Sequence, residues 1–217
     1  MAAPSGTVWG SIVNSHGRIG IYTSVSSTAT QTTVNVQAWF WTWYSCTDSY
    51  NSLYLDIGTG VTSATTKVGS IEINHTRDWG EAWHTDNQTR LYNKTFTYNR
   101  GTSAATYKIY AKFAEVDYIE GTMYANTSFT VPALASYTVS YNANGGSGAP
   151  SAQTKWYGKA LTLSSTKPTR AGHTFQGWAT SASGGVSYSA GGSYTANSAV
   201  TLYAVWKAHT YTVSYNA

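Results

Sequence analysis

Residues 32–44 read TTVNVQAWFWTWY, an alternation of apolar and other side chains that decides the fold class. Successive side chains of an extended strand point to opposite sides, so one face of this stretch is apolar. That face carries Val34, Val36, Ala38 and Phe40. The other face carries Asn35, Gln37, Trp39, Trp41 and Trp43. The stretch therefore predicts a β-strand that turns one face to a hydrophobic core.

Similar short runs occur on both sides of this stretch, separated by clusters of Gly, Ser, Asn and Asp that favour turns. They cover residues 18–24, 52–57, 69–73, 91–99, 106–113 and 126–131. No run shows the 3.6-residue period of an amphipathic helix. Together, seven short strands within about the first 130 residues predict an antiparallel β-sandwich of immunoglobulin or fibronectin type.

Composition favours β-structure along the whole chain. Aromatic residues make up 15% of the sequence and charged residues only 10%. Aromatic and branched side chains suit a pleated, half-buried sheet, whereas helices favour straight-chain residues. The formal charge is +4, but the 13 Lys and Arg residues are spread along the chain. Because a nucleic-acid-binding protein gathers its basic residues on one face, we expect no nucleic-acid partner.

The single cysteine, the first residues and the lack of a long apolar stretch limit the expected classes of protein further. Cys46 has no second cysteine to pair with, so stability must come from hydrophobic cores. Residues 1–6, MAAPSG, hold neither a basic region nor a long apolar run, so we expect no secretory signal there. No stretch approaches the roughly 18 apolar residues that a membrane helix needs. We therefore expect no membrane insertion.

The sequence YTVSYNA occurs twice, at residues 137–143 and 211–217, which gives a repeat period of 211 − 137 = 74 residues. Pro132, in a short segment of small residues, cannot donate to a strand ladder and marks the end of the preceding strand. We therefore expect a β-sandwich over residues 1–132, a repeat over 137–207, and the start of a second, truncated repeat over 211–217. We also expect the natural protein to continue past Ala217.

Three motifs follow one another within the repeat: YTVSYNANGG from Tyr137, KPTRAGHTFQGW from Lys167 and TLYAVW from Thr201. Together they resemble the internalin B-type repeat, also called the Listeria–Bacteroides repeat, of bacterial surface proteins. The resemblance implies a small β-grasp-like domain that acts as a spacer or an adhesion module. His173 departs from the family pattern, which usually has Tyr there, and this departure affects a detail of packing.

The amino-terminal stretch from Gly6 to Trp41 resembles the start of minor structural proteins of tailed phages that infect Gram-positive bacteria. The resemblance implies a virion protein, which leaves the cell by lysis and needs no export signal. The expectation that residues 1–6 hold no secretory signal agrees with this interpretation.

The most enzyme-like segment is NHTRDWGEAWHTD, residues 74–86. Imidazole and carboxylate groups are metal ligands, and this segment supplies His75, Asp78, Glu81, His84 and Asp86. Their spacing matches no known ligand pattern, and polar residues are common in solvated loops, so we predict no metal and no cofactor. The chain also lacks a GxSxG nucleophile motif, and Cys46 has no His nearby in sequence. We expect no catalytic residues and no enzyme activity.

Five tryptophans are the candidate ligand-contact residues. Trp39, Trp41 and Trp43 could form a flat platform for sugar rings or an anchor for a protein partner. The favoured alternative is that their strand is central and buried on both sides. Trp79 and Trp83 lie in a polar stretch, where they either cover an open end of the sandwich or display an aromatic patch.

Taken together, the sequence predicts a non-enzymatic structural protein of a phage virion, a tail-associated or decorating fibre that mediates attachment to the host surface. Expected partners are other virion proteins or a second copy of the chain, and a glycan or protein of the host cell surface. Two alternatives stay open: a bacterial cell-surface adhesin with a repeat stalk, and a carbohydrate-binding module that uses the tryptophan strand.

Overall fold

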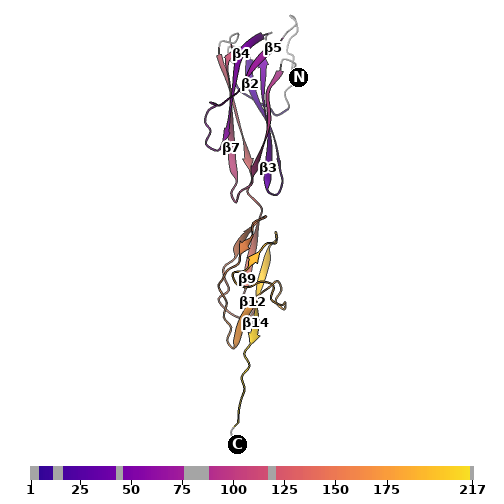
Figure 1. Cartoon of the computed structure of the whole chain (residues 1–217), viewed down its shortest axis with the longest axis vertical. Helices are drawn as coiled ribbons and strands as arrows, with labels where there is room; N and C mark the ends of the chain where they lie inside the picture. The colour runs from indigo at the N-terminus through magenta and orange to yellow at the C-terminus, as the bar shows by residue number, and fades with distance from the viewer. Residues whose placement is uncertain (1–4, 12–16, 43–45, 76–87, 117–120, 216–217) are drawn as a thin grey trace. The chain divides into compact units, whose positions relative to one another are not determined.

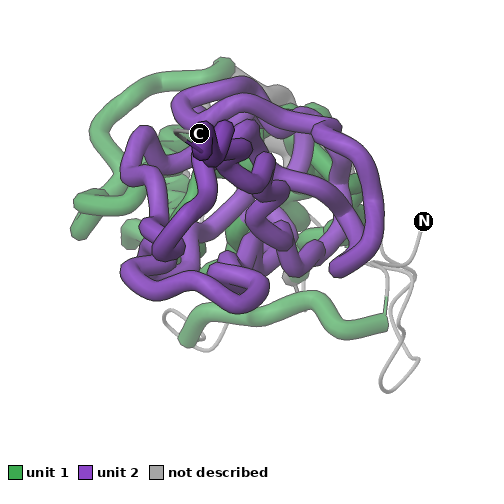
Figure 2. The backbone as a smooth tube through the Cα atoms, turned by 90° about the horizontal axis from the view of Figure 1, so that it is seen from below, with its two compact units in different colours: residues 1–133 green, residues 134–217 purple. Residues whose placement is uncertain are grey.

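The computed structural model describes residues 5–11, 17–42, 46–75, 88–116 and 121–215. Every regular element in these ranges is a β-strand, which confirms the all-β prediction. Within the same ranges, no helix is long and apolar enough to cross a membrane. The chain divides into two compact units, unit 1 over residues 1–133 and unit 2 over residues 134–217 (Figure 2).

The described residues of unit 1 form two four-stranded antiparallel sheets (Figure 1). Sheet A has the order β1 (Val8–Trp9), β2 (Gly17–Ser27), β3 (Gln31–Thr42) and β6 (Gln88–Asn99). Sheet B has the order β5 (Lys67–His75), β4 (Cys46–Gly58), β7 (Ala105–Val116) and β8 (Gly121–Val131). The chain passes between the sheets at β3–β4, β5–β6 and β6–β7, as in immunoglobulin- and fibronectin-like sandwiches.

One hydrophobic core lies between the two sheets. The residues predicted to face inward from β3 are all 0% exposed: Val34, Val36, Ala38 and Phe40. They meet Ile19 and Ile21 of β2 and the inward residues of sheet B, among them Leu53, Ile109 and Phe113. The alternation of side chains in the sequence of β3 therefore predicted correctly which face of the strand is buried.

Strand β6 carries a bulge opposite β3. Ala38 pairs with Tyr92, but the next residue, Trp39, pairs with Arg90, so Leu91 is an extra residue. Leu91 and Tyr92 both pack against the core although they are adjacent in sequence. Beyond the bulge, Arg90 lies opposite Trp39 and is exposed.

The end of unit 1 is held by Arg100, which follows β6. Its guanidinium donates hydrogen bonds to the carbonyl oxygens of Thr28, at 2.6 Å, and Pro132, at 3.1 Å, and also to that of Ala133. Charged donors of this kind make strong hydrogen bonds. The chain is therefore fixed where it leaves β8, at the short segment of small residues that contains Pro132.

Unit 2 contains a mixed sheet and a short ribbon. The sheet has the order β10 (Gln153–Trp156), β9 (Ser136–Asn142), β14 (Val200–Ala208) and β12 (His173–Ala179). Strands β9 and β14 pair in parallel, and the other neighbours pair antiparallel. The ribbon joins β11 (Leu161–Thr162) to β13 (Ser193–Tyr194). A separate core is formed by Val139, Leu163, Trp178, Tyr194, Leu202 and Ala204.

Candidate functional site

The five tryptophans singled out in the sequence have different positions. Trp39 lies on the outward side of β3 but is only 1% exposed. Its indole Nε1 donates a 2.9 Å hydrogen bond to Gln37, so the ring packs rather than offering a free face. Trp41 is partly exposed. The other three, Trp43, Trp79 and Trp83, lie outside the described residues, and so does most of the segment weighed as a metal site, residues 74–86.

Trp41 belongs to a cluster that the sequence did not reveal. The guanidinium carbon of Arg18 lies 4.9 Å from the centroid of the Trp9 ring and 5.0 Å from that of the Trp41 ring. Aromatic faces attract a cation at this distance. Burial lowers the pKa of Arg18. The three side chains form a packed aromatic–arginine cluster at one end of the outer face of sheet A.

Gly20 makes this cluster possible because it has no side chain. A Cβ atom at this position would lie 2.6 Å from the Trp9 ring and 2.8 Å from the side chain of Thr7. Strand β1 can therefore lay Trp9 over the outward side of β2.

The rest of the outer face of sheet A is a polar ladder. Gln37 donates to Asn35 at 3.0 Å, and Asn35 donates to Asn93 at 2.8 Å and to Thr95 at 3.2 Å. These polar side chains of β3 and β6 thus form hydrogen bonds with one another. The outer face of sheet A is therefore largely engaged in its own contacts.

The outer face of sheet B has a different character. The strand registers place Lys67, Tyr54, Lys112 and Tyr124 side by side across β5, β4, β7 and β8. The ammonium nitrogen of Lys112 lies 4.3 Å from the centroid of the Tyr54 ring. Tyr124 is 60% exposed, so its ring is open to solvent. We call these four residues, together with Tyr110 of the next row, the tyrosine–lysine face.

A groove of about 360 Å³ runs beside this face. Its wall is the loop after β4, and its floor comes from β7 and β8. The lining residues are Thr62, Ser63, Ala64, Tyr110, Ala111, Lys112, Tyr124, Ala125 and Asn126. A hollow of this size is within the range of small-molecule sites. It combines phenol rings, hydroxyl groups, a side-chain amide and an ammonium group.

Asp56 holds the loop that walls the groove. One carboxylate oxygen accepts hydrogen bonds from the Thr65 amide, at 2.6 Å, the Thr65 hydroxyl, at 2.9 Å, and the Thr66 amide, at 3.2 Å. Hydrogen bonds from Thr66 and Thr65 lower the pKa of Asp56 to about 2. The Asp56 carboxylate is thus hydrogen-bonded to the loop that it holds.

In unit 2, the motif residues are occupied with the fold. Asn144 has a positive φ of 50°, and its side-chain amide donates to the carbonyl oxygens of Ala182, at 2.8 Å, and Ala204, at 2.9 Å. The Trp206 indole donates to the carbonyl oxygens of Ala143, at 3.0 Å, and Asn144, at 3.1 Å. The NGG turn and the closing tryptophan therefore lock each other in place.

The buried cation of unit 2 also has a structural role. Lys155 is 0% exposed, and its ammonium group donates to the Trp156 carbonyl oxygen at 2.7 Å and to the Asn197 side-chain oxygen at 3.0 Å. The same Asn197 oxygen accepts from the Gly158 amide at 2.9 Å. Lys155 thus ties β10 to the segment before β14.

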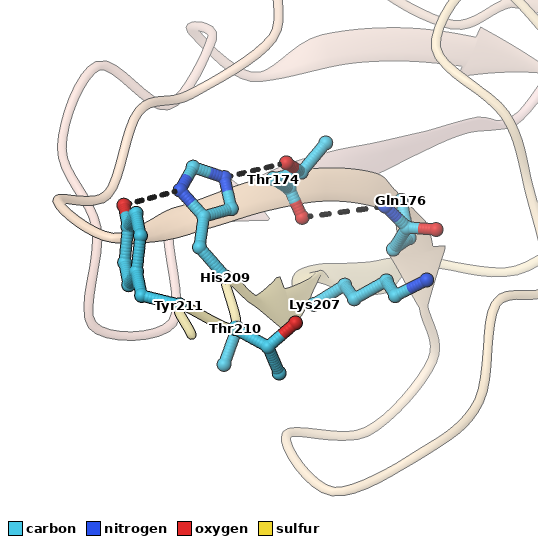
Figure 3. Close-up of a pocket in the computed structure, with 7 residues that line it drawn as sticks. Thr174, Gln176, Lys207, His209, Thr210 and Tyr211 are labelled. Atoms are coloured by element: carbon cyan, nitrogen blue, oxygen red, sulfur yellow. Dashed lines mark hydrogen bonds between the residues drawn. The ribbon is translucent and has the colours of Figure 1, made fainter. Parts of the chain in front are cut away.

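A second hollow, of about 520 Å³, lies in unit 2 beside the end of β14 (Figure 3). Figure 3 shows His209 between Thr174 and Tyr211. The His209 ring makes hydrogen bonds to both: its Nε2 lies 2.8 Å from the Thr174 hydroxyl and its Nδ1 lies 3.2 Å from the Tyr211 hydroxyl. Tyr211 is 79% exposed and lies beyond the end of β14, which is Ala208. Residues 209–211 form one side of the hollow. The shape of the hollow therefore depends on the conformation of these residues.

No group of three or more potential metal ligands gathers in the described ranges. Most of residues 74–86, where the sequence predicts no metal, lies outside those ranges.

In a comparison with protein families, residues 137–205 match the Listeria-Bacteroides repeat domain. This confirms the resemblance seen in the three motifs of the repeat. The repeat is found in surface proteins and is typical of extracellular or cell-surface locations. Comparison with curated proteins finds no match.

Proposed function

We propose that this chain is a non-enzymatic surface-attachment protein in which unit 1 binds a partner and unit 2 is a spacer. The observation that carries the proposal is the match of residues 137–205 to a repeat found in surface proteins, joined to a β-sandwich with an open aromatic face.

The binding role of unit 1 is supported by its tyrosine–lysine face. When a partner covers rings that are exposed to water beside a groove, the burial of their apolar surface favours binding. Tyr124 has this position, and Lys112 beside it offers an ammonium group.

The spacer role of unit 2 is supported by what its motif residues do. Asn144 and Trp206 bind backbone carbonyl oxygens of their own unit. A module whose characteristic residues are used to hold its fold is suited to repetition as a stalk.

We also propose that the protein acts without catalysing a reaction. Asp56, whose pKa is strongly lowered, fixes a loop, and the buried Lys155 ties two strands. Perturbed or buried titratable groups often mark active sites, but these two have structural partners.

The carrier of the protein is either a phage particle or a bacterial cell. The resemblance of residues 6–41 to phage minor structural proteins supports a virion, with other virion proteins or a second copy as docking partners. The repeat supports a bacterial cell surface. On either carrier, the proposed target is a glycan or protein of a cell surface.

Antibodies against the chain test this proposal on intact phage particles and on intact bacteria. Labelling of the outer surface of either supports a surface protein, and labelling of particles selects the virion. Detection only after the cells are broken open contradicts the proposal.

A further inference from the structure

The groove beside the tyrosine–lysine face has a charge pattern that points to a class of ligand. Lys67 and Lys112 flank Tyr54 on its two sides, and Tyr124 continues the row beyond Lys112. Aromatic rings and cations therefore alternate across the four strands of sheet B. A ligand that crosses this row meets positive charge and ring faces in turn.

Asp56, a described carboxylate on this face, is engaged by the neighbouring loop. Asp56 lies in the next row, opposite Tyr110. Its Oδ2 atom accepts three hydrogen bonds from Thr65 and Thr66. The ammonium group of Lys112 instead lies over the Tyr54 ring, 4.3 Å from its centroid. Lys112 is thus positioned by an aromatic ring. Among the residues that the structure describes, no carboxylate pairs with it, so its ammonium group can meet an anion.

The groove supplies polar groups that match a sugar. Thr62 and Ser63 contribute hydroxyl groups from the loop wall, and Asn126 contributes an amide from β8. Tyr110 and Tyr124 offer ring faces on which the C–H groups of a pyranose can pack. Since hydroxyl and amide groups pair with sugar hydroxyls, the lining suits a polar ring-shaped ligand.

From this arrangement we propose that the groove binds an acidic saccharide, a sugar that carries a carboxylate or a phosphate. The ring packs on Tyr124 and Tyr110, the anion pairs with Lys112, and Lys67 extends the positive row. This assignment rests on the proposed attachment function and names the ligand class for it. The overall charge of +4 favours the approach of an anionic polymer.

Binding of the full chain to oligosaccharides, followed by isothermal titration calorimetry, tests this assignment. The probes are an oligomer of a uronic acid, a polymer of glycerol phosphate that carries sugars, and a neutral oligomer of the sugar that corresponds to the uronic acid. We expect binding to the uronic acid oligomer, the phosphate polymer or both, and binding at least about tenfold weaker to the neutral oligomer. Which anion binds identifies the source of the charge. Affinity should fall as salt is added, because exposed charges are screened.

Two variants and two matched controls locate the site. Lys112→Gln and Tyr124→Ala should each weaken binding about tenfold or more. Lys94→Gln is the control for the lysine, because Lys94 also lies over a ring, 5.5 Å from Phe96, but on sheet A. Tyr215→Ala is the control for an exposed tyrosine, since Tyr215 is 91% exposed in unit 2. Both controls should bind like the unaltered chain, and circular dichroism should show the same fold for all four variants.

Equal binding of the neutral and acidic oligomers, no binding of any probe, or equal loss in Lys94→Gln and Lys112→Gln overturns the assignment. The proposed attachment function fails separately, because it depends on where antibodies find the chain and not on these probes.

Discussion

Gly146 shows how a single residue of the repeat motif determines packing. A Cβ atom there would lie 2.5 Å from the Thr169 carbonyl oxygen and 2.5 Å from the Trp206 ring. Overpacking of this kind typically costs about 1–3 kcal/mol. Gly146→Ala should therefore lower the melting temperature of unit 2 by about 4 °C or more, measured by scanning calorimetry of the full chain.

Gly185 provides the matched control, because a Cβ atom there meets nothing within 4 Å. Gly185→Ala should change the stability by no more than about 0.5 kcal/mol. Equal melting temperatures for the two variants would show that the space beside Trp206 is not tight.

Asp56 predicts a dependence of stability on pH. Its pKa is about 2 in the folded chain, below the ordinary value of 3.8, because hydrogen bonds from Thr66 and Thr65 favour the charged form. The stabilisation is therefore fully present above about pH 4 and is lost as the pH falls towards 2. Asp56→Asn should reduce this acid dependence, measured as the free energy of unfolding by urea from pH 2 to pH 6. The same slope in both proteins would contradict the role given to this carboxylate.

At the residue scale, the sequence identified the aromatic residues but not their exposure. Trp39 is only 1% exposed, which fits the favoured expectation of a buried ring and not the alternative of a contact platform. Tyr54, Tyr110 and Tyr124 were not singled out. Alternation shows that a side chain faces outward, but only the fold shows which loop or strand lies over it. The signal that could have found them is the placement of aromatic residues and lysines at alternate positions of adjacent strands.

At the scale of elements, alternation predicts the core best where strands pair regularly. Phe40 is 0% exposed, and its ring centroid lies 5.5 Å from that of Phe113 across the sandwich. Phe40→Ala should cost about 3–5 kcal/mol through lost burial and a cavity. Val25→Ala is the control, since Val25 is apolar but 46% exposed on the neighbouring strand. Urea unfolding measures both, and equal costs would contradict the assignment of the core.

The bulge in β6 marks where this reasoning stops. Leu91 and Tyr92 both pack against the core, although alternation sends neighbours to opposite faces. The position of a bulge depends on the partner strand, so the sequence of β6 alone does not contain it.

The two copies of YTVSYNA show the same dependence on partners. In β9, Val139 is 0% exposed between β10 and β14, whereas Val213 is 70% exposed and residues 211–215 form no strand. Identical residues thus have different structures, because strands are stabilised mainly by the neighbours they pair with.

At the scale of the whole molecule, the repeated motif and Pro132 predict a boundary between a β-sandwich and a repeat. The structure has separate cores in two units, residues 1–133 and residues 134–217. The groove on sheet B was not predictable, because it forms only when the loop held by Asp56 folds beside β7 and β8.

Attachment through unit 1 is the central claim, and sedimentation with purified Gram-positive cell walls tests it most directly. Labelled full chain is compared with unit 2 alone, residues 134–217, which has its own core. We expect saturable retention of the full chain and only background retention of unit 2. No saturable retention of the full chain, or equal retention of unit 2 alone, would contradict the claim.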